Sequence, residues 1–267
     1  MTQEEGEVSS AVVDAVLPAG GRISGPFAAE AGAEVKALIP LGRGTVLEGT
    51  IRALRESAGV GRVVVIGPAE LSGHPAVRGA EAVLPEGESG PENIFRGLHW
   101  LYQANGGRHA ERVLVMTTDL PFLTAETLTR YLEACPANAD LCVPLVRRQE
   151  FEQRFRGAEV RYVKLRDGEW TMGCAFLVRP EALVASRHHV ERAYAARKSQ
   201  WAMARLLGMG FTLRFLVRRL GVSDIERRCQ GMLGCVGAAI RGSPPELAFD
   251  IDRPEDYRYA LRHLGGR

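Results

Sequence analysis

The fold is indicated near the start of the chain by the stretch AVVDAVLPAGGRISG, residues 11–25. Its first seven residues are nearly all apolar, have the length of a β-strand and stop at Pro18. Gly20, Gly21 and Gly25 then interrupt regular structure. Ligands of parallel α/β sheets bind at the carboxyl ends of strands, and glycine-rich backbone can approach an anion closely. We therefore expect this loop to bind phosphate.

Strand and helix patterns alternate through the first half of the chain. Short apolar runs predict further strands at 62–66, 113–116 and 141–146. Apolar residues at helical spacing predict helices at 46–57, after Pro91 and at 125–134, the last with Thr124 as its N-cap. This alternation is typical of a parallel sheet with helices on both faces.

The second half is less regular. Residues 160–165 and 171–178 are predicted to be strands, and residues 190–234 are predicted to be mainly helical and are rich in arginine. A last strand at 247–251 should lead into a helix at 253–264. Without an internal repeat or a clear linker, the chain is interpreted as one α/β domain, residues 1–267, that carries an inserted lobe.

Length and composition are those of an ordinary globular protein. The chain has 267 residues, 46% of them hydrophobic, and a net charge of +2. These values exclude a disordered chain or a fibre and give no sign of a nucleic-acid surface. The longest apolar candidate, residues 206–213, is far shorter than the roughly 18 residues that a membrane helix needs. We therefore expect neither nucleic acid nor a membrane as a partner.

The termini and the cysteines indicate a compartment. The acidic start of the chain is not followed by an apolar run with a small-residue cleavage site, so no secretory signal is predicted. The five cysteines are odd in number and form no CxxC pair, which favours reduced structural thiols over zinc or disulfides. We expect a cytoplasmic protein.

The residues after the glycine loop narrow its chemistry. A Walker loop is excluded because no Gly-Lys-Ser/Thr follows. A dinucleotide fingerprint needs a helix that opens directly from the glycines, and Pro26 and Gly32 oppose one. Lys36, in the segment KALIP, follows the loop closely and can neutralise a triphosphate, and Arg22 adds a second cation.

Three strings then resemble the MobA-like nucleotidyltransferase family. The first is the loop from Leu17 to Gly25 with the KALIP segment that begins at Lys36, although Arg22 follows the glycines immediately, where many members place Arg-Met-Gly later. The second is DLPFLT, which begins at Asp119 after an apolar strand. The third is DIDRPED at 250–256, with arginine where threonine is usual.

The resemblance implies a Rossmann-like, three-layer GT-A-type α/β fold with a mainly parallel sheet and an inserted acceptor-side lobe. It divides the chain into an NTP-binding half at 11–146, an acceptor-side and helical region at 147–246, and a last strand and helix at 247–264. The implied reaction is Mg²⁺-dependent transfer of a nucleoside monophosphate from an NTP to a small-molecule acceptor, expected to carry a phosphate, with release of pyrophosphate.

The resemblance also implies roles for individual residues. The catalytic candidates are Lys36, Asp119 and Arg22. The nucleotide-binding candidates are Leu17, Pro18, Ala19, Gly20, Gly21, Lys36, Asn93 and Asp119, and the backbone N–H groups of Ala19, Gly20 and Gly21 are expected to hold phosphates. The acceptor candidates are Arg161, Lys164, Gly173 and Lys198.

Asp119 and Asp252 are the expected magnesium ligands. Asp250 and Asp252 share one face if both lie in a strand, and Asp252 is nearer the carboxyl end, where the ligand should be. Asp252 followed by Glu255 also fits a capping box for the last helix. Magnesium needs only one or two carboxylates when substrate phosphates complete its coordination.

Two other functions stay open. A GT-A glycosyltransferase would use the same fold, and Asp250-Ile-Asp252 has the form of its Asp-x-Asp metal motif. A non-catalytic nucleotide-binding protein would fit the altered loop spacing and Cys174, against the presence of both metal aspartates. The sequence does not indicate which NTP is used, what the acceptor is, or the oligomeric state.

Overall fold

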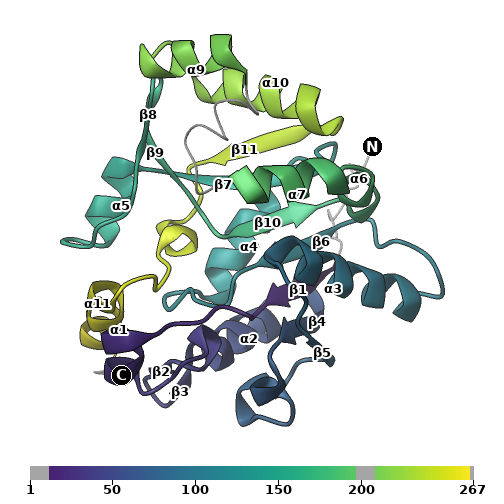
Figure 1. Cartoon of the computed structure of the whole chain (residues 1–267), viewed down its shortest axis with the longest axis vertical. Helices are drawn as coiled ribbons and strands as arrows, with labels where there is room; N and C mark the ends of the chain where they lie inside the picture. Colours follow the sequence, from purple (N-terminus) through teal and green to yellow (C-terminus); the bar gives the residue numbers. More distant parts are fainter. Residues whose placement is uncertain (1–11, 197–207, 265–267) are drawn as a thin grey trace, which may run out of the picture.

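The structure is a computed structural model that describes residues 12–196 and 208–264. Within this part of the chain one nine-stranded sheet forms the centre of the molecule (Figure 1). Its strand order is β5-β4-β1-β6-β10-β7-β9-β8, and β11 also pairs with β7. The strands are β1 Val13–Pro18, β4 Val60–Gly67, β5 Ala82–Pro85, β6 Val113–Met116, β7 Leu141–Arg147, β8 Val163–Leu165, β9 Gly168–Met172, β10 Ala175–Val178 and β11 Gly237–Arg241.

The N-terminal half of the sheet is parallel. β1 lies between β4 and β6 and is parallel to both, with Leu17 opposite Val65 and Val16 opposite Val115. β10 then enters antiparallel to both β6 and β7. The glycine loop after β1 and the DLPFLT loop after β6 therefore leave the same edge of the sheet side by side. The mixed α/β class with a large, mostly parallel sheet is confirmed.

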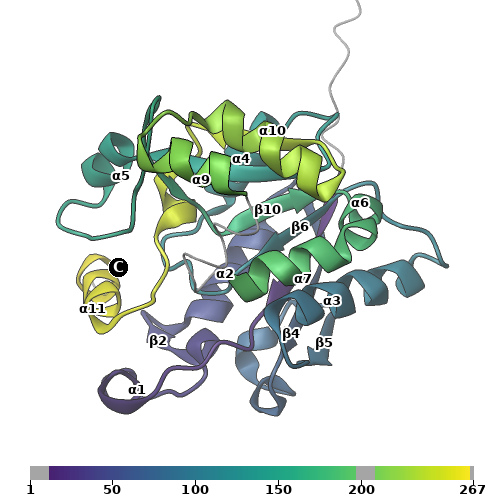
Figure 2. The ribbon, with the colours of Figure 1, turned by 45° about the horizontal axis from the view of Figure 1, so that its top comes forward.

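Helices cover both faces of this sheet. They are α1 Gly25–Ala31, α2 Val46–Glu56, α3 Gly90–Ala104, α4 Ala125–Ala134, α5 Arg148–Arg154, α6 Pro180–Ala185, α7 Arg187–Ala196, α9 Met209–Leu216, α10 Val222–Leu233 and α11 Pro254–Leu264. A short hairpin, β2 Pro40–Leu41 and β3 Gly44–Thr45, precedes α2. In two views α9 and α10 lie at the opposite end of the molecule from α1 and β2 (Figures 1 and 2).

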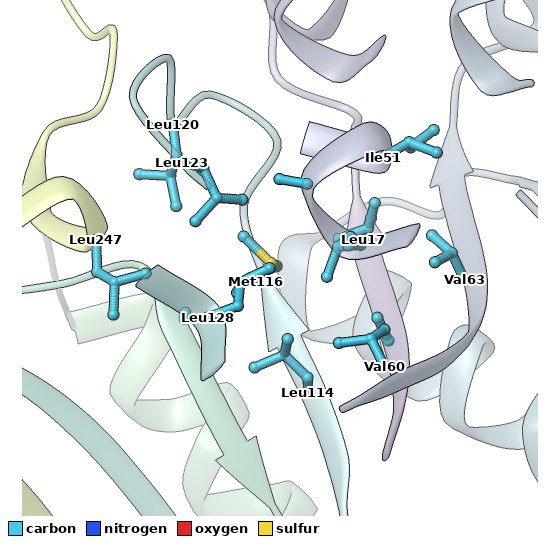
Figure 3. Packing of buried hydrophobic residues seen from close by; sticks show 14 of the residues in the cluster. Leu17, Ile51, Val60, Val63, Leu114, Met116, Leu120, Leu123, Leu128 and Leu247 are labelled. Carbon is cyan, nitrogen blue, oxygen red and sulfur yellow. The ribbon is translucent and has the colours of Figure 1, made fainter. Parts of the chain in front are cut away.

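Alternate residues of β1 face different helices. Leu17 packs in one core cluster with Ile51 of α2 and Leu128 of α4 (Figure 3). Val16 packs in another, with residues of α3 such as Leu98. Because both faces are covered, the strand is apolar apart from Asp14, which is why its pattern was clear in the sequence.

Most predicted elements of the first half form close to the expected positions. Thr124 caps α4 by accepting a hydrogen bond from the amide of Thr127 at 3.1 Å. The helix α1 was not predicted, although Pro26 occupies its first turn and Gly32, in a left-handed conformation, ends it.

The second half departs more from expectation. The predicted strand at 247–251 is wrong, because Pro245–Ala248 form a 3₁₀ helix and the residues after it pair with no strand. The predicted strand at 171–178 is two strands that meet at Gly173. The predicted helical stretch is mainly helical in its described parts, with a break at 217–221, and residues 197–207, which include Lys198, lie outside them.

The predicted cap of the last helix also differs. The carboxylate of Asp256, not that of Asp252, caps α11, because it accepts the amide of Arg253 at 2.9 Å. None of the helices in the described ranges is long and apolar enough to cross a membrane.

Candidate functional site

Three aspartates converge at the carboxyl edge of the sheet. Asp119 follows β6, and Asp250 and Asp252 lie between the 3₁₀ helix Pro245–Ala248 and α11. One carboxylate oxygen from each lies within 4.8 Å of the others. The backbone joins the two segments, because the amide of Ile251 donates to the carbonyl of Asp119 at 3.1 Å. Residues far apart in the sequence thus form one acidic cluster.

The segment at 249–252 alternates although it belongs to no sheet. Phe249 and Ile251 are buried in an aromatic cluster, where Phe249 stands edge-on to Phe122 at a centroid distance of 4.9 Å. Asp250 and Asp252 therefore project to the opposite side, toward Asp119. The sequence prediction that these two aspartates share a face holds, for an extended segment instead of a strand.

Lys36 contacts this cluster directly. Its Nζ atom pairs with a carboxylate oxygen of Asp119 and with one of Asp252. Burial alone would lower the pKa of Lys36, but the two carboxylates hold it above its usual value. The lysine is therefore charged, and its Nζ atom lies at the aspartates and not at the glycine loop.

The remaining charges of the cluster are not balanced by this lysine. Burial, together with the charges of Asp119 and Asp252, raises the pKa of Asp250 to about 7. Burial would also raise the pKa of Asp252, but Lys36 keeps it below its usual value. The buried Oδ1 atom of Asp119 has no hydrogen-bond partner among the described residues.

These features fit a divalent cation with oxygen ligands. Magnesium prefers carboxylates and retains several waters, so two or three of these aspartates with substrate phosphates would complete a site. Such an ion would give the unpaired Oδ1 atom of Asp119 a partner. It would also balance the excess of negative charge that Lys36 leaves in the cluster.

The glycine loop presents two free amides. The amide of Ala19 is already used, since it donates to the carbonyl of Ile66 at 2.7 Å. Those of Gly20 and Gly21 donate to no acceptor within the described residues. Of the three amides that were expected to bind phosphate, those of Gly20 and Gly21 are therefore available. Leu17 and Pro18 are the last two residues of β1.

The side chains of Glu86 and Asn93 lie against Gly20. A Cβ atom at Gly20 would lie 2.2 Å from Oε2 of Glu86 and 3.4 Å from Nδ2 of Asn93. Asn93 is buried, and its Oδ1 accepts the amide of Gly87 at 2.6 Å. Asn93 therefore shapes the loop at 86–88, and its remaining amide group faces the glycine loop.

Arg22 lies away from the aspartate cluster. Its Nη2 atom donates to Glu86 at 3.1 Å and lies 3.8 Å from Glu70. The sequence analysis missed Glu86, for which no local pattern existed. It chose Asp252 over Asp250, and the Asp-x-Asp spacing was the signal that pointed to both.

A cavity of about 490 Å³ adjoins the aspartates on the side of β9. Residues that line it include Asp250, Asp252, Arg161, Thr171, Cys174 and Arg253. Arg253 pairs with Asp256 at 3.1 Å, whereas Arg161 has no acidic partner in the described ranges. Arg161 is therefore the cation in this cavity that is available to a ligand.

The other acceptor candidates from the sequence are not among the described residues that line this cavity with Arg161. Lys164 pairs with Glu169 at 3.1 Å, and Lys198 lies outside the described residues. Gly173 is buried, and a Cβ atom there would lie 2.8 Å from the carbonyl oxygen of Leu247. Close packing accounts for this glycine.

Comparisons with known proteins agree on one family of folds. The family model for the MobA-like NTP transferase domain matches residues 15–219. A hypothetical transferase from Thermus thermophilus is 31% identical, with a TM-score of 0.80 over 92% of this chain and 99% of that one. No curated protein matches the chain.

Two further solved structures, at lower sequence identity, show a likeness of fold alone. The 2-C-methyl-D-erythritol 4-phosphate cytidylyltransferase of Thermus thermophilus is 20% identical, with a TM-score of 0.55 over 96% of this chain and 99% of that one. The 4-diphosphocytidyl-2C-methyl-D-erythritol synthase of Anaerococcus prevotii is 11% identical, with a TM-score of 0.59 over 96% and 97%.

Proposed function

Because this chain belongs to the MobA-like NTP transferase family, we propose that it transfers a nucleoside monophosphate from an NTP to a small phosphorylated acceptor and releases pyrophosphate. The observation that carries the proposal is the cluster of Asp119, Asp250 and Asp252 around Lys36, next to a loop with free glycine amides. One edge of the sheet thus offers carboxylates that could bind a metal ion, and a lysine and free amides that could bind phosphates.

The residues of the loop would bind and orient the NTP. The amides of Gly20 and Gly21 are placed to donate to phosphate oxygens, and Lys36 carries the charge that would offset the pyrophosphate. Asn93 offers its amide group toward the same loop and could contact the base or ribose. Arg22 reaches Glu86 instead, which places its charge at the side of the loop.

Asp119 and Asp252, with Asp250 as a third candidate, would hold magnesium. Bound there, the ion would polarise the α-phosphate and offset its developing charge. The acceptor would lie in the adjoining cavity, where Arg161 is free to bind its phosphate.

An acceptor phosphate needs no strong general base, since it is already ionised near pH 7. One of its oxygens would attack the α-phosphorus in line as the bond to pyrophosphate breaks. Positioning and charge neutralisation would then supply most of the rate enhancement.

A thermal-shift panel tests the donor. The protein would be heated with each of four NTPs, with and without Mg²⁺, and with several nucleotide-sugars, because a ligand that binds only the folded state raises its melting temperature. We expect stabilisation by one NTP that depends on Mg²⁺, followed by pyrophosphate release when phosphorylated acceptors are added.

Two results would contradict the proposal. Stabilisation by a nucleotide-sugar alone would indicate a glycosyltransferase on the same fold. Mg²⁺-dependent NTP binding without turnover on any of a broad set of phosphorylated acceptors would indicate a nucleotide-binding protein.

A further inference from the structure

Lys36 lies where it competes with a metal for the aspartate cluster. Its Nζ atom contacts both Asp119 and Asp252. The side chain of Lys36 is 16% exposed and that of Asp119 is 10% exposed, so the contact is largely shielded from water. The side chain of Asp252 is 65% exposed, so water reaches that end of the contact. The buried carboxylate of Asp119 needs a counter-charge, and in this arrangement the lysine supplies it.

The main chain of Lys36 is anchored at the glycine loop. Its amide donates to the carbonyl of Gly21 at 2.9 Å. Its side-chain stem passes so close to Gly21 that a Cβ atom there would lie 3.4 Å from Cβ and 3.5 Å from Cδ of the lysine. Because the stem runs along the loop, rotation about its last bonds can carry Nζ from the aspartates to the loop without main-chain movement.

The contact leaves part of the cluster unsatisfied. Asp250 makes no ion pair with Lys36, and Oδ1 of Asp119 has no hydrogen-bond partner in the described part of the chain. A purely structural ion pair would satisfy its acids more completely. The lysine therefore has the features of a removable counter-ion.

We propose that Lys36 is the resident counter-ion of the aspartate cluster and leaves it only when an NTP offers new anionic partners at the glycine loop. This inference rests on the proposed function. A divalent cation and the lysine would repel each other in the same cluster, so the cation should bind weakly until the lysine has moved. Because such coupling is reciprocal, NTP and metal should each raise the affinity for the other.

Binding of Mn²⁺ tests this without any catalytic assay. Free Mn²⁺ is measured by electron paramagnetic resonance, with and without the α,β-methylene analogue of the NTP that stabilises the protein, and the Mn²⁺ that the analogue binds in the absence of protein is subtracted. For the native protein we expect weak binding of Mn²⁺ alone and binding at least about tenfold tighter with the analogue. For Lys36→Met we expect Mn²⁺ alone to bind at least about tenfold tighter than to the native protein.

Two further variants control the experiment. Lys36→Arg keeps the charge, so Mn²⁺ alone should still bind weakly. Lys164→Met makes the same change at a lysine that pairs with Glu169 at the surface, and it should bind Mn²⁺ as the native protein does. If Lys36→Met fails to fold, Lys36→Gln, which also removes the charge but can still donate a hydrogen bond to the carboxylates, takes its place in the same titration.

The outcomes separate the inference from the function on which it rests. If the native protein binds Mn²⁺ alone as tightly as with the analogue, the inference is overturned and the proposed metal site stands. If no protein binds Mn²⁺ under either condition, the metal site is overturned and the inference falls with it.

Discussion

The amide of Ile251 donates to the carbonyl of Asp119 at 3.1 Å, and this bond fixes the loop after β6 against the segment that precedes α11. Ile251 is completely buried, so its side chain anchors the same contact. The separation of Asp119 from Asp250 and Asp252 is therefore set by the main chain and the core, and a change of one carboxylate should leave the others in place.

Replacing Asp119 tests the metal role. Asp119→Asn keeps the shape of the side chain and the main-chain bond to Ile251, but it removes a charge that pairs with Lys36 and that the proposed magnesium ion would use. We expect Mg²⁺-dependent pyrophosphate release to fall by about 100-fold or more. Asp14→Asn, in a carboxylate that pairs with Arg62 in the first half of β1, is the matched control and should keep its rate. A native rate in Asp119→Asn would contradict the site.

The candidate site residues that could be proposed from the sequence are those that lie in recognisable local motifs. Asp119 was proposed because the DLPFLT string that follows an apolar strand resembles the metal motif of the family, and Lys36 because it follows the glycine loop. The contact of Glu86 with Gly20 was not predictable, since it joins two loops that have no shared pattern. Contacts of this kind depend on the order of strands in the sheet.

The wrong predictions have local causes. Residues 247–251 alternate like a strand, but Phe249 and Ile251 pack into an aromatic cluster and pair with no strand. The helix α1 was missed because Pro26 and Gly32 were interpreted as breakers, when they mark its first turn and its end. Alternating apolar residues fit a strand or an extended segment outside a sheet, and proline and glycine fit the interruption of a helix or its two ends. Only tertiary contacts decide between these alternatives.

Gly97 tests the packing of α3 on the sheet. A Cβ atom there would lie 2.5 Å from Cγ1 of Val16 and 2.9 Å from Cδ1 of Ile66, both of which are fully buried. We expect Gly97→Ala to lower the free energy of unfolding by about 1–3 kcal/mol, measured by urea denaturation. Gly49→Ala, inside α2 with open space around it, should instead raise it by about 0.5–1 kcal/mol. Equal effects at both positions would contradict this account of α3.

Asp224 tests the electrostatics at the start of α10. The amide of Gly221, at 2.9 Å, and then Arg227 and Arg214 lower the pKa of Asp224 to about 2. Because the folded state holds this pKa below the ordinary value of about 3.9, the carboxylate stabilises the fold above that value, and the effect is lost as the pH falls through about 2.

The measurement for Asp224 compares melting temperatures between pH 6 and pH 2. Asp224→Asn should melt below the native protein at pH 6, and the difference should shrink as the pH falls from about 4 to about 2. A difference that stays constant over this range would show that the charge of Asp224 does not act in this way.

Arg161 tests the acceptor cavity. It lines the cavity beside Asp250 and Asp252 and has no acidic partner in the described ranges, so a ligand phosphate would be its first strong partner. Hydrogen bonds to charged groups contribute about 1.5–3 kcal/mol, and Arg161→Gln should therefore raise KM for the acceptor by about tenfold or more. The melting-temperature shift with NTP and Mg²⁺ should not change, because the glycine loop is untouched.

Lys164 supplies the matched comparison for Arg161. Both residues were acceptor candidates from the sequence, but Lys164 already pairs with Glu169 at 3.1 Å. A phosphate would have to replace that carboxylate, so its net gain from the lysine is smaller and Lys164→Gln should change KM less than Arg161→Gln does. If the two variants raise KM equally, the acceptor phosphate lies along β8 instead of within the cavity. If neither raises it, the acceptor is held by groups other than these two cations.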